Sequence, residues 1–230
     1  MIEANSEYEL NDILCSIDIS VPRRNERRTK DHTEKYAICY LLSTLLNQGK
    51  LSFPLSLCKS ERPDFFLKFG NREIGIEHTE AVAQNVAQSD ALREQGHGQD
   101  VLYMRRSFPD EKKLKSRDLI KEMEENETSG GWIGNSVERD WTAAMSHFAS
   151  KKRRLAKKEG FKIYKENWLL IYDNWRLPNV ILEEAMPMFL EKCISEKYFD
   201  TFSCIYVILS DKLCLFSSSQ TEAYKLNQLS

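Results

Sequence analysis

Two carboxylates are spaced so that a β-hairpin would bring them together. Asp64 begins an apolar run, DFFLKF, and Glu77 lies thirteen residues later within a second run, REIGIEHTEAV. Gly70-Asn71 separates the runs, and a Gly-Asn step between two apolar segments is typical of a tight turn. If the strands pair through that turn, both carboxylates meet at one end of the hairpin. Two convergent carboxylates are the usual protein ligands of Mg²⁺, which takes its remaining ligands from water and substrate phosphate.

Each carboxylate also has a purely structural explanation. An Asp that follows Pro63 is common in turns, and Glu77 could point outward from a half-exposed strand. Gly75, which thins the strand, and the occurrence of both acids at this spacing favour a site. His78 should point to the opposite face from Glu77, because side chains alternate along a strand. We therefore expect His78 to pack or hydrogen-bond and to take no part in chemistry.

Pro63-Asp64, Glu77 after an apolar strand start, and the surrounding strand–hairpin–helix–strand order resemble the PD-(D/E)xK nuclease superfamily, which has the restriction-endonuclease-like fold. The resemblance covers about residues 30–85 and 138–216. It implies that Asp64 and Glu77 hold Mg²⁺ or Mn²⁺ and that the protein hydrolyses phosphodiester bonds, with DNA as the expected substrate. Such an ion polarises a phosphate and lowers the pKa of an attacking water.

The sequence departs from the family pattern at Thr79, where a lysine usually lies two residues after the Glu. Thr cannot supply the positive charge that stabilises a phosphate during attack. The resemblance allows a lysine from a neighbouring helix, and in the helical segment 137–158 Lys152 shares a face with Trp141, Met145, Phe148 and Leu155. We predict that Lys152 has this catalytic role, with Lys151 as second choice. The alternative is a lysine stem lying on apolar surface with its ammonium in water.

A further carboxylate, Glu34, shares a helix face with Ile38, Leu41 and Leu45 in the helix expected over 32–48. The resemblance implies that a Glu in this position can assist as a metal or water ligand. The alternative is a capping box, in which Asp31 is the N-cap residue and Glu34 reaches back to its backbone. Both interpretations stay open.

A strongly basic stretch follows the predicted catalytic lysine. Residues 151–165 contain eight positive charges and one negative charge. Such a cluster is what contact with a phosphate backbone requires, although a solvated helix face is the alternative. The residues predicted to bind nucleic acid are Lys151, Arg153, Arg154, Lys157 and Lys158. Trp132, Trp141 and Tyr164 could stack on bases, but core packing is expected for Trp141. A second basic run, RRNERRTK over 23–30, is interpreted as a solvated connector.

These residues require an α/β framework to position them. The expected order is helix 32–48, the two strands of the hairpin, helix 137–158, a strand in NWLLIYDNW, a helix containing Pro187, and two closing strands. Continuous apolar runs such as WLLIY and CIYVIL are typical of strands buried on both faces. We therefore predict a mixed central sheet flanked by helices on both faces, which is a restriction-endonuclease-like core.

A single domain over 1–230 is expected, with two additions to the core. An N-terminal extension, 1–26, contains the alternating segment ILCSIDISVP, which predicts an edge strand. A polar insertion over about 86–137 is expected to lack a core of its own. The insertion could serve as a lid, a specificity element or a dimerisation arm, so a homodimer is one possible assembly.

The overall composition excludes several classes of protein. Lys and Arg total 33 against 35 Asp and Glu, so the net charge is −2, and 41% of residues are hydrophobic. This balance excludes a disordered, collagenous or uniformly basic chain. No apolar run approaches the roughly 20 residues of a transmembrane helix, and the N-terminus lacks a signal-peptide pattern. We therefore expect a cytoplasmic protein with no membrane partner. The six cysteines form no CxxC pair, and neither a zinc ribbon nor disulfides are expected.

Three hypotheses follow from the sequence. The first is a metal-dependent nuclease acting on DNA. The second is a catalytically inactive protein of the same fold, which binds nucleic acid or a protein partner through the basic helix and the insertion. The third is a different α/β fold with an unrelated small-molecule site, in which Asp64 and Glu77 would point to different faces of the sheet.

Overall fold

The computed structural model describes residues 1–24, 26–100, 105–125, 131–158 and 160–229. Within these residues eight strands form one mixed sheet and lie side by side in their order along the chain. Strands β1 to β4 are antiparallel neighbours, β4 to β6 run parallel, and β6 to β8 are antiparallel. The strands are β1 (Ile2–Ala4), β2 (Leu55–Lys59), β3 (Phe65–Phe69), β4 (Arg72–Ala81), β5 (Glu166–Asp173), β6 (Cys204–Leu209), β7 (Lys212–Phe216) and β8 (Thr221–Lys225).

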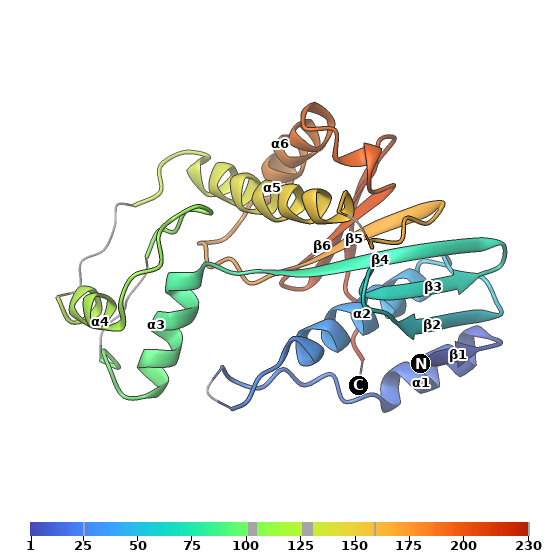
Figure 1. The fold of residues 1–230 in the computed structure, drawn as a ribbon, viewed down its shortest axis with the longest axis horizontal. Coiled ribbons are helices and arrows are strands. Elements are labelled where there is room, and N and C mark those ends of the chain that lie inside the picture. Colours follow the sequence, from blue (N-terminus) through green and yellow to red (C-terminus); the bar gives the residue numbers. More distant parts are fainter. Residues whose placement is uncertain (25, 101–104, 126–130, 159, 230) are drawn as a thin grey trace.

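Helices cover both faces of this sheet (Figure 1). The first face packs against α1 (Glu7–Ser16) and α2 (Lys30–Asn47), and the second against α5 (Ser136–Ala156) and α6 (Leu182–Ser195). Two further helices, α3 (Gln84–Glu94) and α4 (Ser116–Glu124), lie beyond the end of β4, and a 3₁₀ helix, Tyr198–Asp200, follows α6. The predicted mixed sheet with helices on both faces is confirmed.

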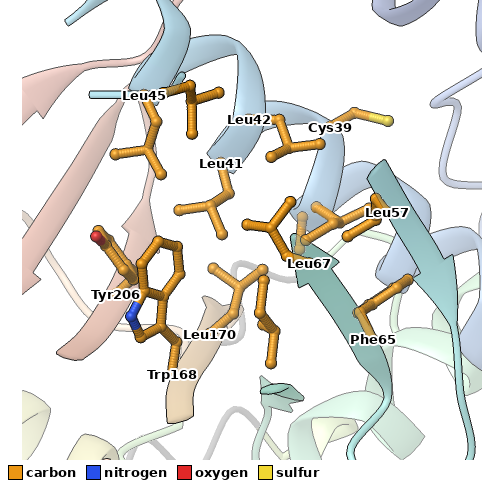
Figure 2. Packing of buried hydrophobic residues seen from close by; sticks show 14 of the residues in the cluster. Cys39, Leu41, Leu42, Leu45, Leu57, Phe65, Leu67, Trp168, Leu170 and Tyr206 are labelled. Atoms are coloured by element: carbon orange, nitrogen blue, oxygen red, sulfur yellow. The ribbon is translucent and has the colours of Figure 1, made fainter. Parts of the chain in front are cut away.

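The central strands are apolar throughout because both of their faces are covered. In β5, Trp168 and Leu170 point into the core shared with α2, whereas Leu169 and Ile171 point into the core shared with α5 and α6. Figure 2 shows Trp168 and Leu170 packed with Leu41 of α2. Alternating side-chain directions combined with two covered faces give the continuous apolar run seen in the sequence.

The position of α5 is fixed by a buried hydrogen bond as well as by apolar packing. Trp141 Nε1 donates to Asp173 Oδ2 at 2.6 Å, and the backbone N–H of Trp175 donates to Asp173 Oδ1 at 2.8 Å. Trp141 is fully buried, so the expectation that it packs in the core is confirmed. Burial raises the pKa of Asp173 to about 7, although both hydrogen bonds oppose the shift.

The predicted β3–β4 hairpin is confirmed. Phe69 pairs with Arg72, which leaves Gly70 and Asn71 as a two-residue turn. Gly70 has φ +54°, a conformation that side chains with a Cβ rarely adopt. The turn thereby fixes the register of the strands that carry both predicted carboxylates.

The N-terminal extension differs from its prediction. The edge strand expected over 13–22 is absent from the described residues, and α1 occupies Glu7–Ser16 instead. Leu10 and Leu14, one helical turn apart, are both fully buried, and Ser6 Oγ caps the helix by accepting from the Glu9 backbone N–H at 3.2 Å. Helical spacing and the cap outweigh the short alternation, and the sheet edge is formed by β1.

The insertion has a small core of its own, contrary to expectation. Leu92 of α3 packs with Leu119 and Met123 of α4 in a cluster separate from the two main cores. Parts of the insertion, residues 101–104 and 126–130, lie outside the described residues. In the described part of the chain no helix combines the length and apolar character needed to cross a membrane.

Gly75 of β4 leaves no room for a side chain. An added Cβ would lie 2.7 Å from Tyr164 Cδ2 and 2.8 Å from Pro63 Cγ. We expect Gly75→Ala to lower the free energy of unfolding by about 1–3 kcal/mol, because ring atoms on both sides must shift. Urea unfolding monitored by circular dichroism measures the change. Gly131→Ala is the control, since open space surrounds that position, and equal stability of the two variants would contradict the prediction.

Asp173 should make stability depend on pH. In the unfolded chain an Asp ionises near pH 4, whereas the folded protein retains this proton up to about pH 7. The folded state binds more protons in that range, so stability falls as the pH rises. Between about pH 5 and about pH 8, wild type should lose about 2 kcal/mol relative to Asp173→Asn. Urea titrations at both pH values test this, and a pH-independent difference would overturn it.

Candidate active site

Asp64 and Glu77 converge as the hairpin spacing predicts. Phe65 pairs with Ile76, and continuing that register by one residue places Asp64 opposite Glu77. Both residues are buried, with 5% and 7% of their surface exposed. Asp64 is fixed further by its Oδ2, which accepts a hydrogen bond from the His78 backbone N–H at 2.7 Å. The two carboxylates therefore lie side by side in a buried position at the end of the β3–β4 hairpin.

Lys152 joins this pair from α5. Its Nζ lies 2.6 Å from Glu77 Oε1 and 3.6 Å from Asp64 Oδ2. The side chain is only 12% exposed. Helical spacing explains the placement, because the fully buried Met145 lies two turns earlier on the same face and packs against the sheet. Thr79, two residues after Glu77, lines the cavity beside Lys152.

Glu34 is linked to the carboxylate pair indirectly, through lysine side chains. Lys30 Nζ lies 2.6 Å from Asp64 Oδ1 and 2.6 Å from Glu34 Oε1, so it bridges the two carboxylates. Lys59 Nζ lies 3.0 Å from Glu34 Oε2 and also pairs with Asp31. Glu34 is thus connected to the site through Lys30.

The capping box proposed for Asp31 and Glu34 is not formed. The N-cap residue of α2 is Thr29, whose backbone N–H donates to His32 Nδ1 at 3.1 Å. The helix therefore begins two residues earlier than that box requires. His32 supplies the return hydrogen bond, and Glu34 is left to contact Lys30 and Lys59.

Burial and charge act differently on the two carboxylates. Burial disfavours the charge of Asp64, but Lys152, Lys30 and the His78 N–H outweigh it and hold the pKa of Asp64 below its usual range. Burial raises the pKa of Glu77 above its usual range, and the adjacent Asp64 adds to this shift despite Lys152. Like charges in one pocket push the two pKa values apart.

His78 takes no part in this network through its side chain. The ring is 1% exposed, and neither ring nitrogen has a hydrogen-bond partner among the described residues. Burial lowers the pKa of His78 to about 3, so the ring is neutral. The prediction that His78 packs is confirmed, whereas the hydrogen bond offered as an alternative comes only from its backbone.

The pair fits a divalent cation. Glu77 Oε2 is a buried carboxylate oxygen with no partner among the described residues, and a second carboxylate lies beside it. Across the described ranges, no three His, Cys, Asp or Glu side chains form a metal-binding group. The protein would therefore contribute two carboxylates, which suits Mg²⁺ or Mn²⁺, since such ions take other ligands from water and phosphate.

The basic residues near the end of α5 point to two different sides of the helix. Lys151 and Lys152 line a cavity of about 480 Å³ beside the carboxylates. Arg153 and Arg154 line another cavity on the α6 side, where the Arg153 guanidinium lies 5.6 Å from the Tyr198 ring centre and donates to the Glu196 carbonyl. Lys157 and Lys158 are exposed just past the end of α5. The five predicted nucleic-acid contacts therefore do not form one surface.

Four cationic residues at the site were not predicted from the sequence to lie there. No sequence pattern indicated that Lys59 reaches the site, because its contact with Glu34 joins elements that are far apart along the chain. Arg24, Arg28 and Lys30 belong to the RRNERRTK run that was interpreted as a solvated connector. Arg24 and Arg28 instead form ion pairs with Glu80 of β4, so the connector interpretation is wrong for these two residues.

Comparison with known proteins returns no relatives. No protein-family model matches the chain, no curated protein is significantly similar to it, and no solved structure matches it significantly. The function must therefore be argued from the site itself.

Removal of the Lys152 ammonium should destabilise the fold strongly, because it leaves buried negative charge uncompensated. Lys152→Met leaves two buried carboxylates without their shared ammonium, and we expect a loss of about 3 kcal/mol in the free energy of unfolding. Lys151→Met is the matched control, because Lys151 is exposed and should change stability by less than about 0.5 kcal/mol. Urea unfolding measures both variants. Equal stability of the two would show that the ammonium contributes nothing.

Proposed function

We propose that the protein is a metal-dependent nuclease that hydrolyses phosphodiester bonds, with DNA as the expected substrate. The observation that carries this proposal is a buried pair of carboxylates, Asp64 and Glu77, that shares one lysine. Glu77 Oε2 has no hydrogen-bond partner in the part of the chain that the structure describes. The resemblance to the PD-(D/E)xK superfamily supports it. Assignment of the mixed sheet to a restriction-endonuclease-like core is part of the same proposal.

The residues of the site have distinct roles in this proposal. Asp64 and Glu77 would hold Mg²⁺ or Mn²⁺, which, when bound, polarises a phosphate oxygen and lowers the pKa of an attacking water. Lys152 would place its ammonium where negative charge develops on the phosphate. In the PD-(D/E)xK pattern a lysine on the strand has this role, and here Thr79 stands in its position. Glu34 would act through Lys30, by holding that lysine against Asp64.

A second candidate function is binding without catalysis, to nucleic acid or to a protein partner. It is favoured by the lysines, because Lys30, Lys59 and Lys152 already pair with the carboxylates of the site. The network is then electrically balanced with no metal present. This alternative predicts salt-sensitive binding of nucleic acid without metal-dependent turnover.

Metal binding separates the two functions. We expect wild type to bind Mn²⁺ in isothermal titration calorimetry, and Asp64→Asn and Glu77→Gln each to weaken binding by at least about tenfold, because each removes one of two charged ligands. Both substitutions keep the shape of the side chain, and Asp64→Asn retains an acceptor for the His78 N–H. DNA cleavage with Mn²⁺ should be lost in the same variants.

Glu166→Gln is the matched control for this experiment. Glu166 is also a paired carboxylate on the sheet, but its partner is Arg72, at the opposite end of β4. It should bind Mn²⁺ like wild type. Absence of Mn²⁺ binding in wild type, or full cleavage by Asp64→Asn, would overturn the nuclease proposal.

A further inference from the structure

Half of β4 has a free edge next to the site. β4 runs from Arg72 to Ala81, but β3 pairs only with residues 72–76. On its other side β4 pairs with β5 as far as Ala81. Within the described residues, the β3-side edge of 77–81 therefore has no strand partner. Figure 1 shows β4 continuing past the end of β3.

The cavity of about 480 Å³ lies against this free half of β4 and is strongly basic. His78, Thr79 and Glu80 form its strand wall. Five cations surround it, of which two precede α2, one begins α2 and two come from α5: Arg24, Arg28, Lys30, Lys151 and Lys152. Glu80 is the only carboxylate among the described lining residues. Two segments that are far apart in the chain, the stretch leading into α2 and the end of α5, therefore direct positive charge into one groove.

The positive charge of this groove is only partly neutralised. Lys30 and Lys152 are paired with the site carboxylates, but Arg24 and Arg28 share a single oxygen, Glu80 Oε1, at 3.2 and 2.5 Å. Asn174 Nδ2 also donates to that oxygen at 2.7 Å. The single negative charge of Glu80 is thus shared by two arginines, so one of their two positive charges is not neutralised. Lys151 makes no ion pair with any described residue and adds a second.

The groove continues beyond the two arginines. Arg24 and Arg28 also line a larger cavity, of about 900 Å³, at the carboxyl ends of β5 and β6. Ligands of open α/β sheets commonly bind at such strand ends. The two cavities adjoin at these arginines, so a chain-like ligand in the smaller cavity, next to Lys152, has a path along β4 to the carboxyl ends of β5 and β6.

The lining residues favour phosphate over base recognition. Among the described residues the smaller cavity offers no exposed aromatic ring, since His78 is 1% exposed. Binding of single strands through bases relies on aromatic stacking platforms. Arginine and lysine side chains bind the sugar-phosphate backbone instead, and they do so without reading sequence.

We propose that Arg24, Arg28 and Lys151 form a binding groove for the sugar-phosphate backbone of one nucleic-acid strand, beside the position where a metal ion on Asp64 and Glu77 would bind the scissile phosphate. This inference rests on the proposed nuclease function, of which it names the substrate path. It assigns this role to Arg24 and Arg28, which precede α2, and to Lys151 of α5, all of which line the cavity against the free half of β4. The far end of the basic helix, Lys157 and Lys158, lies outside the groove.

Fluorescence anisotropy tests the groove without metal. The probe is a fluorescein-labelled single-stranded DNA of about 16 nucleotides, titrated in EDTA at several salt concentrations. Arg24→Gln/Arg28→Gln should weaken binding several-fold and reduce the salt slope by about 0.7 per lost phosphate contact. A label-matched strand with abasic sites in place of its bases should bind wild type as well as the normal strand does.

The controls separate charge at the groove from charge elsewhere. Lys68→Gln/Arg72→Gln also removes two cations and disrupts two ion pairs, at the opposite end of the β3–β4 hairpin, and should bind like wild type. Arg24→Gln alone keeps Arg28 and Asn174 on Glu80, so it tests the groove if the double variant does not fold. Arg24→Lys/Arg28→Lys should retain most of the salt slope.

Two results would overturn the groove. The first is that the single and the double arginine variants both bind DNA as tightly as wild type. The second is that the Lys68→Gln/Arg72→Gln control loses as much DNA affinity as the arginine variants do. The nuclease proposal fails on different data, namely Mn²⁺ binding and cleavage by Asp64→Asn. Loss of DNA binding in the arginine variants of a protein without cleavage activity would support the groove and reject the nuclease.

Discussion

Negative charge buried between the sheet and two helices is the constraint on which the rest of the structure depends. Asp64 and Glu77 lie side by side with little access to water, and such a pair is strongly unfavourable unless cations compensate it. Lys30 and Lys152 provide that compensation from helices on opposite faces of the sheet. A shift of either α2 or α5 would disturb this compensation, because both ammonium groups reach Asp64.

Apolar packing makes this convergence possible. Leu41 of α2 and Met145 of α5 are fully buried on the two faces of the sheet, and close packing of this kind resists small displacements. The hydrogen bond from Trp141 to Asp173 adds a fixed point at the end of β5. Desolvated ion pairs contribute little net stability, so the two cores must supply the stability that the polar site lacks.

Local signals in the sequence predicted the parts of the site that depend on local geometry. The Gly70-Asn71 turn set the hairpin register, and helical spacing placed Lys152 on the buried face of α5. The contacts of Lys30 could not be predicted, because they depend on where α2 lies relative to the sheet. The basic stretch 151–165 was predicted as a surface for phosphate contact, but successive helical residues point about 100° apart. Lys151 and Lys152 therefore line one cavity, and Arg153 and Arg154 line another.

An unpaired strand edge carries a risk that is separate from any ligand. The His78 N–H on this edge already donates to Asp64, but the rest of the free half of β4 has no strand partner among the described residues. Sheets with bare edges tend to aggregate by adding a strand of another molecule. Arg24 and Arg28, anchored on Glu80, lie against that edge. Charged, bulky side chains at an exposed edge oppose the approach of a second sheet, so the position of these two arginines disfavours association of sheets along β4.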